Sequence, residues 1–201
     1  MASQKLRTVL KMVSTDLSEK QVPYALIGAL ALSLYGLPRF TTDIDLLTEE
    51  RFQPLISSIM GRLGYSCYQK TRSFAQFDAE SGVLGKIDFM FVTTQDGREI
   101  LRRSVTVKDD LMGDHPVIQP TDYIILKLMA IANNPERSAR DEGDIVEVLK
   151  LYKGGLVPEI FGPLDRDRLY LFAERFGQRD RVQSLFDRIF SNVSEQGGFE
   201  L

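Results

Sequence analysis

Two aspartates separated by a single residue are the first candidates for chemistry in this 201-residue chain. Asp43 and Asp45 lie in an apolar run that is typical of a β-strand. Side chains of a strand alternate between its faces, so both carboxylates project from one face and Ile44 and Leu46 from the other. Neighbouring carboxylates repel each other unless a cation lies between them, and Mg²⁺ prefers hard oxygen ligands. The pair therefore predicts a metal site.

A glycine precedes this pair, at the end of the short apolar run 25–27. Gly28 is followed by a small-residue segment that ends at Gly36, a pattern that predicts a strand, a sharp turn and a helix. The N-terminus of a helix presents free N–H groups to an anion. Because one short helix joins the two strands, a phosphate at Gly28 would lie near a metal at Asp43 and Asp45. The stretch 24–48 predicts a site for a metal-bound nucleoside triphosphate.

The spacing of these residues resembles a known signature. It is similar to the hG[GS] and R-x-T-x-D-h-D motifs of the DNA polymerase β-like nucleotidyltransferase superfamily, and within it to small bacterial proteins of the AbiEii and type IV toxin–antitoxin kind. The resemblance implies an α+β nucleotidyltransferase fold, a mixed β-sheet with flanking helices followed by a C-terminal helical segment. It also implies a toxin–antitoxin partner protein. The matching positions are Gly28, Ala29, Gly36, Arg39, Thr41, Asp43 and Asp45.

The resemblance implies a third carboxylate on a later strand. Alternation in segment 86–92 places Ile87 and Phe89 on an apolar face and leaves Asp88 on the other face. Asp43, Asp45 and Asp88 are then the catalytic and metal-binding residues, with Mg²⁺ or Mn²⁺ as the metal. Asp88 would either complete a second metal site or accept the proton of the acceptor hydroxyl.

The same resemblance implies that Gly28, Ala29, Arg39, Thr41 and Lys127 contact the nucleoside triphosphate. Ala29 departs from the family pattern because it replaces a residue whose hydroxyl can hold a phosphate. Backbone N–H groups would then serve in its place. Arg39 would contact a phosphate or pair with one of the strand acids. Lys127 would reach the triphosphate or extend along the protein surface with its ammonium group in water.

Composition is that of an ordinary folded domain, with 43% hydrophobic and 26% charged residues and a net charge of −3. The acidic balance argues against a broadly basic nucleic-acid platform. Cys67, the single cysteine, is expected in the core and fits a reducing cytosol. No apolar run approaches the roughly 18 residues of a membrane span, and the N-terminus does not resemble a signal peptide, so we expect a cytoplasmic protein with no membrane contact.

Periodicity predicts a packing helix over residues 1–19, a nucleotidyltransferase domain over 20–118, a helical segment over 119–192 and a loose tail over 193–201. Within them, Thr121 is the expected N-cap of a helix over 123–132. His115 is expected in a loop. The predicted helices are 5–20, 30–35, 49–63, 98–104, 123–132, 138–152, 165–176 and 179–190, and the predicted strands are 25–27, 43–48, 65–70, 74–79, 83–92, 105–107 and 116–118.

Two groups of charged residues can each be interpreted in two ways. One run resembles an R-x-x-[RK]-D-x-x-D-I motif of similar proteins, and it could equally form a helix surface with internal ion pairs. It contains Arg137, Arg140, Asp141 and Asp144. A second group could approach the phosphates of a tRNA or other acceptor, although a solvated face is the better prediction. It contains Arg98, Arg102 and Arg103.

The function that the resemblance implies is Mg²⁺-dependent transfer of a nucleoside monophosphate from a nucleoside triphosphate to an acceptor hydroxyl. The acceptor could be a tRNA or other RNA end, a protein or a small molecule. A first alternative, favoured by Ala29, is a catalytically silent nucleotide-binding regulator or antitoxin-like partner with the same fold. A second alternative is a phosphoesterase that uses the same carboxylates to activate water.

Overall fold

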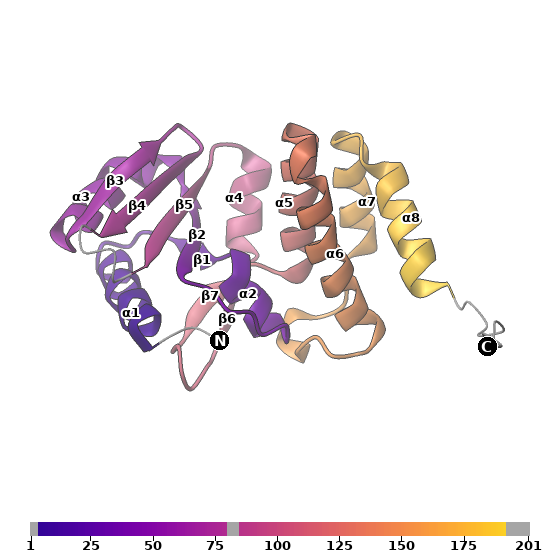
Figure 1. Ribbon diagram of the computed structural model, residues 1–201, viewed down its shortest axis with the longest axis horizontal. Helices are drawn as coiled ribbons and strands as arrows, with labels where there is room; N and C mark the ends of the chain where they lie inside the picture. Colours follow the sequence, from indigo (N-terminus) through magenta and orange to yellow (C-terminus); the bar gives the residue numbers. More distant parts are fainter. Residues whose placement is uncertain (1–3, 80–84, 192–201) are drawn as a thin grey trace, which may run out of the picture.

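A seven-stranded mixed sheet lies beside a group of C-terminal helices (Figure 1). The computed structural model describes residues 4–79 and 85–191, and the strand order is β3-β4-β5-β2-β1-β7-β6. The predicted α+β architecture is confirmed. The strands are β1 (Tyr24–Leu26), β2 (Asp43–Glu49), β3 (Tyr65–Lys70), β4 (Phe74–Ala79), β5 (Lys86–Val92), β6 (Val105–Val107) and β7 (His115–Val117). The α-helices are α1 (Gln4–Glu19), α2 (Gly28–Tyr35), α3 (Gln53–Arg62), α4 (Gln95–Arg102), α5 (Pro120–Asn133), α6 (Ser138–Lys153), α7 (Arg166–Arg175) and α8 (Arg179–Phe190).

Strand β2 lies in the middle of the sheet. It pairs antiparallel with β1, where Leu26 is opposite Leu46, and parallel with β5, where Asp45 is opposite Asp88. Ile44 and Leu46 are fully buried, as the alternating pattern predicts. Since a slip of one residue would move every side chain of a strand to the opposite face, burial of these residues fixes the register that puts Asp45 beside Asp88.

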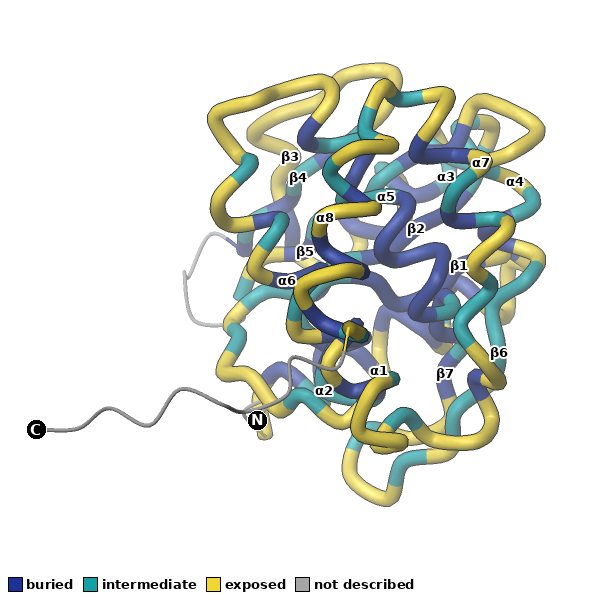
Figure 2. Tube along the Cα trace, turned by 90° about the vertical axis from the view of Figure 1, so that its right-hand side faces the viewer, coloured by how far each residue is buried: buried dark blue, intermediate teal, exposed yellow. Residues whose placement is uncertain are grey.

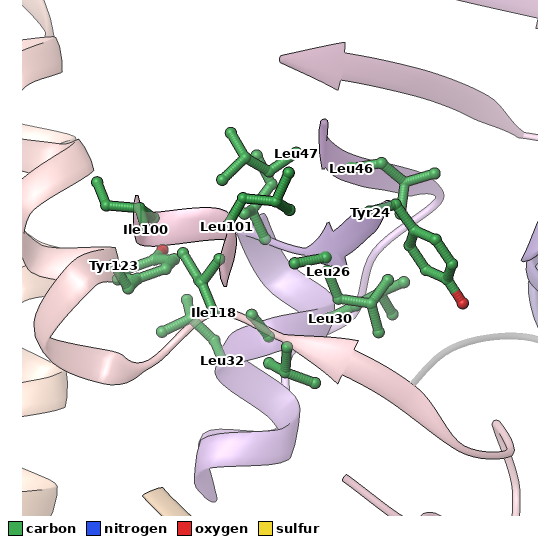
Figure 3. Close-up of a cluster of buried hydrophobic side chains, with 14 of the residues drawn as sticks. Tyr24, Leu26, Leu30, Leu32, Leu46, Leu47, Ile100, Leu101, Ile118 and Tyr123 are labelled. Carbon is green, nitrogen blue, oxygen red and sulfur yellow. The ribbon is translucent and has the colours of Figure 1, made fainter. Parts of the chain in front are cut away.

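The core joins the sheet to its helices. The apolar stripe predicted for the first helix is buried, and α1 packs against α3 and β2. On β1, β2 and the neighbouring helices, a second set of side chains converges (Figure 3), and the tube in Figure 2 shows β1 and β2 as the buried centre of the molecule. This set includes Leu26, Leu30, Leu46, Leu47, Ile100, Leu101 and Tyr123.

The helix α5 begins earlier than predicted, and Thr121 is not its N-cap. Pro120 stands in the first turn, which suits its fixed φ and missing N–H, and Gln119 is the N-cap. The Thr121 hydroxyl instead accepts a hydrogen bond from the backbone N–H of Asp165, 3.1 Å away. Asp122 is fully buried and binds Arg103 (3.2 Å) and Arg168 (2.8 Å). These contacts join α5 to the end of α4 and to α7.

Three side chains lie in environments that differ from the predictions. His115 is in β7, where it is buried and hydrogen-bonded to the Tyr24 hydroxyl at 3.1 Å. Cys67 is exposed, because β3 is an edge strand whose residues beyond Tyr65 are not covered. Arg103 is only partly exposed and pairs with Asp122, whereas Arg98 and Arg102 are exposed as predicted.

Most predicted element boundaries agree with the structure to within a few residues. Helix α4 starts three residues early, at Gln95, because the Thr94 side chain caps it by accepting a hydrogen bond from the N–H of Gly97. The start of the predicted strand 83–92 and the predicted tail 193–201 lie outside the described residues. Within residues 4–79 and 85–191, no helix has both the length and the apolar character needed to cross a membrane.

The Asp122 cluster yields a stability prediction. Asp122→Ala would leave Arg168 and Arg103 without their buried partner, so the free energy of unfolding should fall by about 3 kcal/mol, as measured by urea denaturation. Asp110→Ala is the control, because Asp110 is exposed and such substitutions change stability by about 0.5 kcal/mol or less. A similarly small change in the free energy of unfolding for both variants would contradict the role of Asp122 in joining α5 to α4 and α7.

Candidate active site

The eight residues predicted from the sequence line one cleft. Its volume is about 650 Å³, within the range of about 300–1,000 Å³ that ligand pockets span. The sheet supplies the acids from β2 and β5, the start of α2 and the loop before β2 supply further residues, and α5 supplies the lysine. The predicted residues in the lining are Gly28, Ala29, Arg39, Thr41, Asp43, Asp45, Asp88 and Lys127.

The three strand acids lie on the same face of neighbouring strands. Asp45 is directly opposite Asp88 in the parallel ladder, and Asp43 is two residues before Asp45 on β2. Burial and then the charges of Asp88 and Asp43 raise the pKa of Asp45 to about 6. Burial also raises the pKa of Asp88, assisted by the charge of Asp43. The acids therefore repel one another, as the spacing on the strand predicted.

The two oxygens of Asp88 have different surroundings. Its Oδ2 accepts a hydrogen bond of 2.8 Å from Nε2 of Gln76, which lies opposite Asp88 on β4. Its Oδ1 is buried and has no hydrogen-bond partner among the described residues. Gln76 was not among the predicted site residues. Alternation in segment 74–79 could have placed Gln76 on the polar face of its strand, although not opposite Asp88.

Gly28 is in direct contact with Asp45. Its φ of +62° is in the region that favours glycine, and a Cβ at this position would lie 2.0 Å from Oδ2 of Asp45. The neighbouring Ile27 N–H donates a hydrogen bond of 3.0 Å to the carbonyl oxygen of Asp45. Ile27 is the N-cap of α2 and offers no side-chain acceptor to the first turn. The first N–H groups of α2 therefore lie at the cleft, beside the acids, and no N-cap side chain binds them.

The basic residues of the cleft are held mainly by helix acids. Lys127 donates to Asp141 at 2.8 Å and forms an ion pair with Asp144 at 2.7 Å. Its side chain is only 18% exposed, so the surface interpretation of Lys127 is wrong. Arg39 forms an ion pair with Asp144 of α6 and not with a strand acid. Burial raises the pKa of Asp144, but hydrogen bonds from Lys127 and Arg39 outweigh it and hold that pKa below its usual value.

The charged run on α6 is not simply a helix surface. Asp141 and Asp144 are buried, and their ion pairs with Lys127 join α6 to α5. Arg137 pairs with Asp141 at 3.1 Å. The Arg140 side chain lines the cleft and has no hydrogen bond or ion pair within the described part of the chain, and its charge acts to lower the pKa of Asp45. Arg140 therefore faces the strand acids across the cleft without a direct partner.

The donor set suits a hard divalent cation. Carboxylate oxygens are the ligands that Mg²⁺ prefers, and the orphaned Oδ1 of Asp88 and the raised pKa of Asp45 both indicate charge that a cation would compensate. Within residues 4–79 and 85–191, no three acidic, histidine or cysteine side chains form a ready-made metal cluster. The acids are a candidate ligand set and not a preassembled metal centre.

Comparison with solved structures identifies the fold. No protein-family model matches the chain, and no curated protein sequence matches it. The antibiotic-resistance factor ANT(2'')-Ia superposes with a TM-score of 0.60 at 12% identity, over 90% of this chain and 96% of that one. The chain has the nucleotidyltransferase fold.

Two further structures share the nucleotidyltransferase fold. An antigenic nucleotidyltransferase-like protein from Paracoccidioides brasiliensis matches with a TM-score of 0.54 and 16% identity, over 96% of this chain and 99% of that one. A candidate nucleotidyltransferase from Thermotoga maritima matches with a TM-score of 0.53 and 19% identity, over 70% and 93%. The finer resemblance to AbiEii proteins stays a prediction.

Burial of Asp45, together with repulsion from the other strand acids, predicts a pH-dependent stability change. The folded-state pKa of Asp45 is about 6, above the ordinary 3.8, so its ionisation destabilises the fold as pH rises between these values. In the absence of divalent metal, Asp45→Asn should therefore raise the free energy of unfolding by about 2 kcal/mol at pH 8, a value that allows for solvent access. Near pH 4 the substitution should leave the free energy of unfolding unchanged. Urea denaturation across pH measures this. The control is Asp114→Asn, because Asp114 is exposed. An equal increase in the free energy of unfolding at both pH values would contradict the raised pKa of Asp45.

The contact between Gly28 and Asp45 yields a second prediction. Gly28→Ala should destabilise the protein in two ways, through strain at positive φ and through overlap with the Asp45 carboxyl group. In an Asp45→Ala background the nearest overlapping atoms are absent, so the same substitution should cost at least about 1 kcal/mol less. A double-mutant cycle by thermal denaturation tests this, and additive effects would contradict the proposed contact.

Proposed function

We propose that this protein transfers a nucleoside monophosphate from a nucleoside triphosphate to an acceptor hydroxyl. One observation carries the proposal. Asp45 and Asp88 are in register on neighbouring strands, beside Asp43 and against Gly28, with a raised pKa at Asp45 and an orphaned oxygen at Asp88. Such an arrangement is unfavourable in isolation and becomes favourable when a cation and an anionic substrate are bound.

The strand acids would hold the metal. Asp43 and Asp45, with Asp88, would bind Mg²⁺ or Mn²⁺, and the metal would supply stabilisation of negative charge on the transferred phosphoryl group. Gln76 holds one oxygen of Asp88 in place. The other oxygen of Asp88 would serve as a ligand or would accept the proton of the attacking hydroxyl.

The start of α2 and the basic side chains would bind the phosphates. The N–H groups of Gly28 and Ala29 and the side chain of Arg140 would contact the β- and γ-phosphates. Arg39, Thr41 and Lys127 would complete this site. The acceptor oxygen would attack the α-phosphorus in line while the bond to the pyrophosphate oxygen breaks, so that pyrophosphate leaves with its negative charge bound by these groups.

Structural neighbours support this class of reaction. ANT(2'')-Ia has also been solved in complex with adenylyl-2''-tobramycin, and that structure matches with a TM-score of 0.60 and 12% identity over 87% of this chain and 98% of that one. For the present protein we propose the transfer chemistry, with an acceptor drawn from RNA ends such as tRNA, proteins or small molecules. The AbiEii resemblance would add a bacterial cytoplasmic setting and a toxin–antitoxin partner protein.

A catalytically silent nucleotide-binding regulator is the alternative. Two observations favour it. Ala29 lines the cleft where a hydroxyl side chain would otherwise stand, and the charges of Arg39 and Lys127 are balanced by Asp144 and Asp141. A regulator would bind the triphosphate with Mg²⁺ and release it unchanged.

A transfer assay separates these functions. The purified protein is incubated with each α-³²P-labelled nucleoside triphosphate, Mg²⁺ and fractionated RNA, protein and metabolites. We expect label in one fraction and a loss of at least about 100-fold in Asp43→Ala, because the metal site is removed. Addition of Mg²⁺ should raise the Tm of the wild type and not of Asp43→Ala.

The exposed Asp114→Ala variant is the control and should transfer label normally. Full transfer by a folded Asp43→Ala variant would rule out the proposed site. Mg²⁺-dependent binding without transfer would establish the regulator, and monophosphate release without any acceptor would establish a phosphoesterase.

A further inference from the structure

One aromatic side chain at the cleft is largely surrounded by solvent. Phe40 is 79% exposed and lines the same cleft as the strand acids. Among the described residues, the other large exposed hydrophobic side chains are not part of that lining. They are Met12, Tyr68, Leu111, Leu156, Ile160 and Leu171. The exposed ring therefore coincides with the candidate active site.

The loop that carries Phe40 is anchored on both sides. Before it, the Arg39 side chain is paired with Asp144 and the Arg39 N–H approaches the Ser33 hydroxyl at 3.4 Å. After it, the Thr41 hydroxyl and the backbone of Asp43 are 3.1 Å apart. These contacts hold the backbone of Phe40 beside the acids, while the ring itself makes no stacking or cation–π contact with any described residue.

The residues that line the cleft comprise a polar part and an apolar part. The start of α2 and the acids form the polar part, which suits phosphates and metal. Leu126 and Ala130, four residues apart on one face of α5, line the cleft together with Met90, and all three are partly exposed. A nucleotide that placed its phosphates at the polar part would leave a flat base to be accommodated by apolar and aromatic surface.

We propose that Phe40 stacks on the base of the bound nucleoside triphosphate. This inference rests on the proposed nucleotide site but not on turnover. Base–aromatic stacking contributes about 1–3 kcal/mol per base and is available to every base, because each has a π face. Phe40 thus supplies affinity with little discrimination among bases, and its ring becomes covered when the nucleotide binds.

The absence of tryptophan from the sequence permits a direct test. Phe40→Trp introduces a single tryptophan into a chain that has no other. ATP, CTP, GTP and UTP with Mg²⁺ should each quench its fluorescence, and inorganic tripolyphosphate should not. Leu171→Trp is the matched control, because Leu171 is 52% exposed and outside the cleft lining, and none of these ligands should quench it.

Calorimetry gives the second readout. Phe40→Ala should weaken binding of each triphosphate by about 5- to 150-fold and leave the affinity for tripolyphosphate unchanged, whereas Phe40→Tyr should retain nearly full affinity. Equal effects on nucleotide and tripolyphosphate, or an unchanged nucleotide affinity in Phe40→Ala, would overturn the proposal. Binding with these properties but without label transfer would refute the transferase and keep the stacking role. A wild-type protein that binds no nucleotide would refute both.

Discussion

The contact between a carboxylate and a glycine is the constraint on which the cleft depends. Asp45 can lie beside the start of α2 only because residue 28 has no Cβ and adopts a positive φ. The same junction carries the hydrogen bond from the Ile27 N–H to the Asp45 carbonyl oxygen, which joins the start of α2 to strand β2. Asp45 and the first N–H groups of α2 therefore lie side by side at this junction.

Two sets of carboxylates lie in the cleft or directly behind its wall, and their environments are opposite. Asp141 and Asp144 on α6 are buried with cations, and hydrogen bonds from Lys127 and Arg39 hold the pKa of Asp144 low despite its burial. Asp45 and Asp88 on the strands have no ion pair with any residue that the structure describes, and their pKa values are raised. The helix acids thus stabilise the wall of the cleft, whereas the strand acids retain an unbalanced charge that is available to ligands.

Local patterns predicted most of the fold, and the predicted site residues line one cleft. Alternation in segments 43–48 and 86–92 placed Asp43, Asp45 and Asp88 on the correct face of their strands. Burial of the apolar side chains on one face determines which side chains lie on the opposite face. Errors arose where contacts join distant segments. Arg39 and Asp144 are 105 residues apart, and no local pattern indicates their pairing. Cys67 and His115 were misplaced for the same reason, because edge position and strand pairing are properties of the assembled sheet.

The order of the cleft components along the chain has a consequence for protein synthesis. Strands β2 and β5 are parallel, so the pairing of Asp45 with Asp88 forms only after the intervening helix and hairpin have left the ribosome. The α6 wall, with Asp144 and Arg140, is translated later still. A nascent chain that ends before α6 therefore carries the strand acids without the side chains that hold Lys127 and Arg39, and the complete cleft forms only after α6 has been translated.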